Sequence, residues 1–412
     1  MPASKTDSKR RSRAKPRPAA TAPEPAASPA LQELRELARS YSFSDVEQAV
    51  ANGRQAIWGG TGWELPLIYA CDTIPAGEAE FWREGSHESE AIAESEYQVP
   101  GEFCSMVKAM IGKLRQRSKN EKIRRILCFG SACEPFNIVF EMARREGYEI
   151  HTIEAVTTFR LADQRPEVIQ FLISELRKVA LWLTGKEVDE ERLRQEIRRK
   201  NLLSAKVRRI MDLRLNNPLY MGSSSVLQLM DGYFHYFGDP ARFERILDDL
   251  AQELKAAAPY HAPDSYIPLV LAGSFVGSPA LFDVVESSRG AFVGWEIFGT
   301  RDYREDLPPL ESLAHYLLDA QLLGMYGEGA GSAVHLRKVN IEALLKKTGA
   351  KGVVSASVTS CPYGSLVPQL ERQHFKACGI PYINLETTVH LDPPTEEQIT
   401  RLKTFVEMLS DA

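Results

Sequence analysis

Cysteine is the residue of this 412-residue chain with the clearest capacity for chemistry, and three of the six cysteines lie in predicted turns or helix starts. Cys133 follows the apolar run 126–129, and Cys361 follows the apolar run 353–358. Both runs are typical of buried parallel strands, and open α/β sheets bind ligands at the carboxyl ends of their strands. Cys104 lies in the first turn or two of a predicted helix, where the helix dipole favours a thiolate. We therefore expect an inorganic centre shared between two domains.

The remaining cysteines have a simpler interpretation. Cys71, Cys128 and Cys378 are predicted to be small buried hydrophobic residues. The chain has no C-x-x-C pair, which weakens a structural zinc site. An iron–sulfur cluster tolerates distant cysteines, and three thiolates would leave one iron open. A nucleophilic cysteine is the other chemical option, but the sequence cannot place a histidine beside any thiol.

The elements that position these cysteines form a unit that occurs twice. A strand at 126–129, a helix at 136–145 and a strand at 148–153 are predicted around Cys133. The same layout returns as a strand at 353–358, a helix at 365–377 and a strand at 381–385. This alternation predicts an α/β fold with two Rossmann-like (flavodoxin-like) parallel-sheet domains.

Composition shifts along the chain predict four regions. Residues 1–30 are basic and rich in Pro, Ala and Ser, and are predicted to be a disordered tail. An N-terminal α/β domain at 31–164 follows, with its first helix starting near Leu31. Residues 165–262 have a wholly helical pattern and are predicted to join it to a C-terminal α/β domain at 263–412.

The overall composition narrows the function classes. The formal net charge of −5 argues against nucleic acid as the main partner. No apolar run reaches the ~18 residues that a membrane helix needs. Six cysteines in 412 residues do not make a secreted disulfide framework, which favours a reducing cytoplasm.

Several short blocks, in this order and spacing, resemble the 2-hydroxyacyl-CoA dehydratase and benzoyl-CoA reductase family over roughly residue 40 to the C-terminus. The blocks are WELPLIYA at 63–70 with IP at 74–75, FCSMVK at 103–108, SACE at 131–134, EERL at 190–193 with Asn201, TSC at 359–361, GIPYINLE at 379–386 and TRLKTFVE at 400–407. The resemblance implies that Cys104, Cys133 and Cys361 hold a [4Fe-4S] cluster, alone or as part of a double-cubane cluster. Two positions depart from the family pattern. Glu134 stands where members commonly have Asp, and the cysteine that several carry at 296–300 is absent.

The function implied by the resemblance is that of an iron–sulfur subunit of a 2-hydroxyacyl-CoA dehydratase, a hydro-lyase acting on an acyl-CoA. In this family a separate ATP-hydrolysing iron–sulfur activator injects one electron, which agrees with the absence of a Walker A loop here. A ketyl radical anion of the thioester then loses the 2-hydroxyl group. Family members pair with a homologous second subunit, so we expect a heterodimer or a homodimer. Glu64 and Glu134 are the carboxylates we predict for proton transfer.

Two other classes use the same sequence features differently. A benzoyl-CoA-type or double-cubane reductase of aryl-CoA or small molecules would bind its cluster through the same three cysteines. A metal-free structural α/β protein would carry them only as thiols. Iron and sulfide analysis of anaerobically purified protein separates a cluster-binding protein from a metal-free one, and turnover with a 2-hydroxyacyl-CoA versus benzoyl-CoA separates the dehydratase from the reductase.

Overall fold

A computed structural model of the chain describes residues 28–41, 43–59, 64–76, 85–118, 122–129, 133–154, 165–258, 266–273, 278–296, 302–323 and 333–410. Most of the predicted tail, residues 1–27, lies outside them. The domain limits predicted at 164 and 262 also fall outside the described ranges and stay predictions.

Eight strands form two all-parallel sheets, which confirms the predicted α/β class with two parallel sheets. The N-terminal sheet has the order β2-β1-β3-β4, from β1 (Gln55–Gly59), β2 (Thr73–Ala76), β3 (Arg125–Phe129) and β4 (Glu149–Ile153). The C-terminal sheet has the order β6-β5-β7-β8, from β5 (Ile267–Gly273), β6 (Gly290–Trp295), β7 (Gly352–Val358) and β8 (Tyr382–Thr387). The two orders are equivalent, and in each the chain reverses direction across the sheet between the first and third strands. That switch point is where doubly wound sheets bind ligands.

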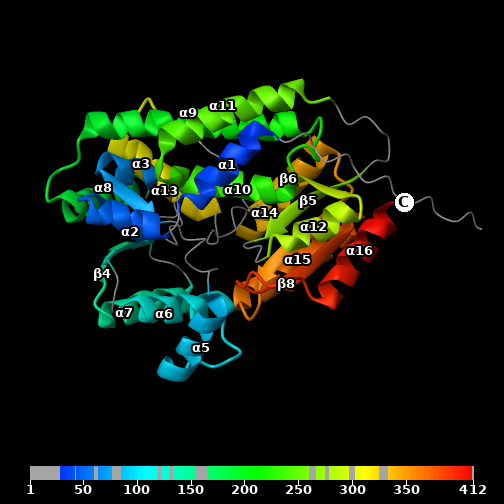
Figure 1. Cartoon of the computed structure of the whole chain (residues 1–412), viewed down its shortest axis with the longest axis horizontal. Coiled ribbons are helices and arrows are strands. Elements are labelled where there is room, and N and C mark those ends of the chain that lie inside the picture. Colours follow the sequence, from blue (N-terminus) through cyan, green and yellow to red (C-terminus); the bar gives the residue numbers. More distant parts are fainter. Residues whose placement is uncertain are drawn as a thin grey trace, which may run out of the picture.

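Helices surround both sheets (Figure 1). The N-terminal part of the chain forms α1 (Pro29–Arg39), α2 (Phe43–Ala51), α3 (Leu65–Ala70), α5 (Ser86–Tyr97), α6 (Ser105–Arg117) and α7 (Glu134–Arg145). The middle of the chain forms α8 (Arg165–Thr184), α9 (Glu190–Arg214), α10 (Ser223–His235), the 3-10 turn η2 (Tyr236–Gly238) and α11 (Pro240–Ala256). The C-terminal part forms α12 (Ala280–Ser287), α13 (Pro309–Leu323), α14 (Ala333–Thr348), α15 (Pro362–Ala377) and α16 (Glu396–Ser410).

Each sheet is buried on both faces, as parallel sheets are. Along β1, Ile57 points into a core shared with α8 and α13, whereas its neighbour Trp58 points into the largest core. Along β5, Val270 contacts the core beneath α14 and α15, whereas Leu269 points into the same largest core as Trp58. The inner faces of the two sheets therefore share one continuous hydrophobic core, which fixes their strand ends relative to each other.

The first described helix packs far along the chain. α1 lies against α11, and α9 and α11 run together along the upper edge of Figure 1. Ser28 caps α1 by accepting a hydrogen bond from the Leu31 amide at 3.0 Å, and its hydroxyl donates to Glu253 on α11. The amide of Ala30 donates to Glu253 at 2.9 Å. The helix begins at Pro29, two residues before the predicted start, because proline fits the first helical turn.

Among the described helices, none is long and apolar enough to cross a bilayer.

Candidate metal centre

The three predicted cysteines occupy the same position on three different helices. Cys104 is the N-cap residue of α6, Cys133 that of α7 and Cys361 that of α15. The local sequence explains this placement, since proline at the first turn starts both α7 and α15 directly after β3 and β7. β3 and β7 hold equivalent places in the two sheets. Two thiols therefore come from equivalent strand ends, and Cys104 adds a third from the helix preceding β3.

Each of these sulfur atoms faces the positive end of a helix. The backbone amide of Gly364 donates to the Sγ of Cys361 at 3.3 Å. The amides of Met106 and Val107 favour the thiolate of Cys104, and the amide of Phe136 favours that of Cys133. Helix N-termini carry unpaired amides and about half a positive charge, so they stabilise anions. The arrangement is suited to a negatively charged group.

Cys361 lies near each of the other two cysteines, across the two halves of the molecule. A hydrogen bond to Cys361, together with burial, raises the pKa of Cys104. Burial raises the pKa of Cys133, and the nearby Cys361 and Glu134 act in the same direction. The backbone also bridges the halves here, because the Ser105 amide donates to the carbonyl oxygen of Thr359 at 3.5 Å.

The turn before Cys361 has an unusual backbone. Ser360 adopts a left-handed conformation with φ of +61°, which is uncommon for a residue other than glycine. Such conformations cost of order 1–3 kcal/mol and cluster at functional sites. The turn places the Cys361 sulfur at the start of α15, toward Cys104.

This donor set fits an iron–sulfur cluster. All three thiols are half-buried, so they are accessible to a bound group without being fully solvated. Thiolates are the protein ligands of such clusters, and a bound metal deprotonates a coordinating thiol. The raised pKa values of Cys104 and Cys133 favour the protonated thiol, and a positively charged metal core would reverse that preference.

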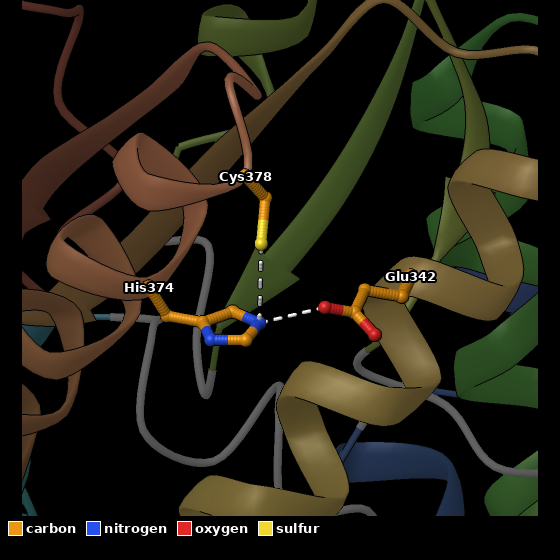
Figure 2. A group of neighbouring side chains, drawn as sticks. All are labelled: Glu342, His374 and Cys378. Carbon is orange, nitrogen blue, oxygen red and sulfur yellow. Dashed lines mark hydrogen bonds and ion pairs between the residues drawn. The ribbon is translucent and has the colours of Figure 1, made fainter.

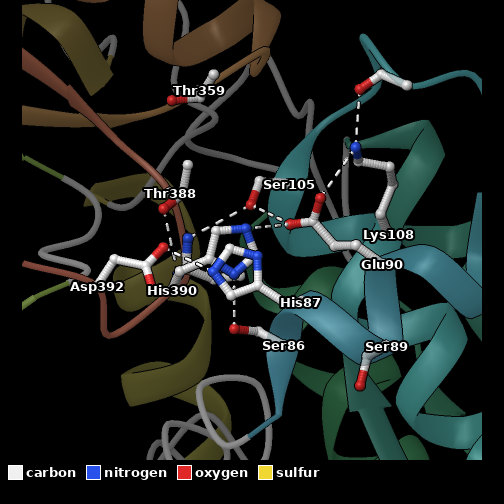
Figure 3. Close-up of polar contacts among 12 residues, drawn as sticks. Ser86, His87, Ser89, Glu90, Ser105, Lys108, Thr359, Thr388, His390 and Asp392 are labelled. Atoms are coloured by element: carbon white, nitrogen blue, oxygen red, sulfur yellow. Dashed lines mark hydrogen bonds and ion pairs between the residues drawn. The ribbon is translucent and has the colours of Figure 1, made fainter.

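A buried polar network adjoins Cys104 and holds α6 in place (Figure 3). Lys108 is 5% exposed and forms ion pairs with Glu90 at 2.9 Å and with Glu94 at 2.7 Å, both on α5. Its ammonium group also donates to the carbonyl oxygen of Gly101 at 2.8 Å. Burial lowers the pKa of Lys108, but the Glu94 and Glu90 carboxylates outweigh it and raise the pKa overall. Lys108 is therefore an internal cation between α5 and α6.

The network continues to the loop after β8. Glu90 accepts a hydrogen bond from the Ser105 hydroxyl at 2.6 Å and lies 3.1 Å from Nε2 of His390. The other ring nitrogen of His390 contacts the Ser86 hydroxyl at 2.7 Å, and the His87 ring stacks on it with centroids 3.6 Å apart. Burial lowers the pKa of His390, although Glu90 acts against this. The network links the two sheets directly beside Cys104.

The two predicted carboxylates lie in different environments. Glu134 is the first residue of α7, is exposed, and sits close enough to Cys133 to affect its pKa. Glu64 is 2% exposed at the start of α3, and its charge acts on the buried Tyr303 hydroxyl. Tyr303 in turn stacks on Tyr316 of α13 with ring centroids 3.9 Å apart. The proton-transfer roles of both carboxylates stay predictions.

The structure also sorts the remaining cysteines. Cys71 and Cys128 are buried, as predicted. Cys378 is exposed, so the prediction that it is buried is wrong, because it is the C-cap residue of α15 and lies past the buried face of that helix.

Sequence reasoning missed Glu90, His390 and Ser86 altogether. α5 carries polar residues around most of its surface, so no apolar stripe predicted the helix. His390 lies in a loop some 300 residues away from its partner Ser86, and no local pattern signals such a contact. The FCSMVK block was the one available pointer, since it contains both Ser105 and Lys108.

Comparison with known proteins gives one family. A model of the family described as 2-hydroxyglutaryl-CoA dehydratase, D-component, matches residues 65–409. The matched segment contains Cys104, Cys133 and Cys361 and every strand of the two sheets except β1. No curated protein matches the chain.

Proposed function

The chain belongs to the 2-hydroxyglutaryl-CoA dehydratase D-component family, and from this premise we propose that it is the iron–sulfur subunit of an activator-dependent 2-hydroxyacyl-CoA dehydratase. The observation that carries the proposal is the convergence of three helix-capping cysteines from two equivalent strand ends and α6. Cys104, Cys133 and Cys361 would hold a [4Fe-4S] cluster. When bound, such a cluster supplies one-electron chemistry and, with three protein thiolates, one iron that has no protein ligand.

The residues around the thiolates prepare the site for this chemistry. The amides of the three helix N-termini offset the negative charge of the sulfur ligands. The ion pairs of Lys108 fix α6, and with it the Cys104 sulfur, against α5. Glu134 is exposed beside Cys133, so its carboxylate is our first choice for moving a proton at the substrate. Glu64 is buried and its charge acts on Tyr303, so its carboxylate would help to fix the position of the Tyr303 side chain.

The partners follow from the same premise. We propose that the chain pairs with a homologous subunit, as a heterodimer or a homodimer, and receives electrons from a separate ATP-hydrolysing iron–sulfur activator. The substrate would be a 2-hydroxyacyl-CoA. Half-buried cysteines agree with this, since an electron donor must approach the cluster closely.

Iron and sulfide analysis of the anaerobically purified protein tests the ligand set. Serine at Cys104, Cys133 or Cys361 should abolish or strongly reduce the iron content and the cluster absorption. Serine at the buried Cys71 or Cys128 provides the matched control and should leave both unchanged. Full iron content in the Cys361→Ser variant would refute the assignment.

Turnover assays test the reaction. With the activator, ATP and a reductant, we expect water elimination from a 2-hydroxyacyl-CoA and no reduction of benzoyl-CoA. The opposite preference would reassign the protein to the reductase class, with the same ligands. Glu134→Gln should lower turnover while keeping the iron content, whereas loss of iron would show a structural role.

A further inference from the structure

A second group of metal-ligating side chains lies away from the candidate centre, at the opposite end of α15 (Figure 2). Glu342 comes from α14, and His374 and Cys378 come from α15. One ligand atom of each lies within 4.8 Å of the other two. Nε2 of His374 is 2.6 Å from Oε1 of Glu342 and 4.0 Å from Sγ of Cys378. Among the residues that the structure describes, these three are the one group of His, Cys, Asp or Glu side chains whose ligand atoms all lie within 4.8 Å of one another.

The backbone of α15 places two of these ligands on the same face of the helix. His374 and Cys378 are four residues apart, so they lie on one face of α15. Cys378 is the C-cap residue, and Gly379, with φ of +70°, ends the helix immediately after it. The carbonyl end of a helix carries partial negative charge and favours a cation. α14 packs against α15, which brings Glu342 over the same face.

The donor set selects the kind of cation. One nitrogen, one oxygen and one sulfur ligand are typical of zinc, with bond lengths of about 2.0–2.1, 2.0–2.2 and 2.3 Å. Tetrahedral angles at these lengths require about 3.3 Å between nitrogen and oxygen and about 3.6 Å between nitrogen and sulfur. The observed 2.6 and 4.0 Å differ from these values by about 0.7 and about 0.4 Å, which small side-chain rotations can make up. The nitrogen–oxygen pair is closer because it now shares a proton.

We propose that Glu342, His374 and Cys378 bind a zinc ion at the C-terminal end of α15. On binding, the Cys378 thiol releases its proton to solvent, and the proton on Nε2 of His374 is transferred through solvent to Nδ1, so that the zinc takes the place of the hydrogen bond between His374 and Glu342. Three protein ligands leave the fourth position to water. The ion ties α14 to the helix whose other end carries Cys361. The site does not rest on the proposed dehydratase function and shares no residue with it.

The proposal is tested by measuring whether zinc protects the Cys378 thiol from alkylation. The full-length protein is titrated with zinc chloride from about 0.1 to about 100 µM, a range that covers micromolar affinities. Iodoacetamide labelling of the Cys378 peptide is then followed by mass spectrometry. A free zinc concentration about ten times the dissociation constant should slow labelling about elevenfold. Because each cysteine is read in its own peptide, zinc at Cys104, Cys133 or Cys361 does not affect the result.

Variants that keep the thiol identify its partners. His374→Ala should remove the protection, and Glu342→Gln should shift the zinc dependence to higher concentration. Gln373→Ala changes an exposed neighbour on α15 and should behave as the wild type. All three positions lie at least partly on the surface, so the variants should fold, which circular dichroism checks. Absence of protection in the wild type, or equal protection in His374→Ala, would overturn the proposal.

Discussion

Replacing Lys108 by methionine should loosen α6 from α5 and disturb the candidate metal centre from outside its proposed ligand set. Methionine keeps much of the apolar stem but removes the cation that faces Glu90, Glu94 and the Gly101 carbonyl. Breaking a buried ion pair by removing one partner costs about 3–5 kcal/mol, because a buried charge is left uncompensated. Glu94 is 43% exposed and regains water, whereas Glu90 is 13% exposed and does not. We therefore expect about 3 kcal/mol, the lower end of that range.

Native-state hydrogen exchange measures this loss locally, which suits a large chain that need not unfold in one step. A loss of about 3 kcal/mol corresponds to roughly 150-fold faster exchange of the α6 amides. The double variant Lys108→Met/Glu90→Gln removes both charges, so its α6 should exchange more slowly than in Lys108→Met alone. Lys122→Met changes an exposed lysine outside α6 and is the control. Equal exchange in the single and double variants would refute the reasoning.

The same variant has a pH signature. In the wild type, burial and the positive charge of Lys108 lower the pKa of His390, while Glu90 raises it. Without the positive charge of Lys108, the attraction of the Glu90 carboxylate for protonated His390 is less opposed, so the pKa of His390 rises. Because the pKa of His390 is higher in the variant than in the wild type, protonation of His390 costs the variant less stability. The exchange penalty of Lys108→Met should therefore shrink as the pH falls from 8 through the pKa of His390.

Three further predictions concern stability. Ser28→Ala removes the N-cap of α1 and a hydrogen bond to Glu253, which should lower the free energy of unfolding by about 1 kcal/mol. As the matched comparison, deletion of residues 2–27 keeps Ser28 and should leave the melting temperature unchanged. Burial and the charge of Lys200 lower the pKa of His235 from its ordinary value of 6.5 to about 3. Below pH 6.5 the unfolded chain therefore binds a proton at His235 that the folded chain does not, and the free energy of unfolding should fall by about 2 kcal/mol between pH 7 and pH 5. In urea titrations, His235→Gln should flatten this part of the profile. Gly112→Ala places a methyl group 1.7 Å from a backbone oxygen of α5, so limited proteolysis should cut α5 faster than in the wild type.

The candidate ligands were predictable because their signals are local. An apolar strand, a cysteine and a helix in sequence determine where Cys133 and Cys361 must lie. The helix start at Pro362 was placed three residues too late, at 365, because the turn residues before it lack an apolar pattern. Cys378 was assigned to the interior from the usual burial of cysteine, although the C-cap position directs it outward.

The polar surroundings of the centre were not predictable because they depend on contacts between distant segments. His390 contacts Glu90 and Ser86 across a long stretch of sequence, in a structure whose two sheets share one core. Nothing in the composition of α5 distinguishes Glu90 from its other acidic residues. Partner choice in such networks follows from tertiary packing, which periodicity does not encode.

The packing of α1 on α11 has a consequence for synthesis on the ribosome. The apolar face of α1, with Leu31, Leu34 and Leu37, emerges well before its partner helix α11, which ends at Ala256. At about 5–20 residues per second, translation takes roughly 10–40 s to cover that interval. During this time the nascent chain exposes an amphipathic helix that has no partner to cover it. We therefore expect chaperones that bind emerging apolar helices to associate with the nascent chain during this interval.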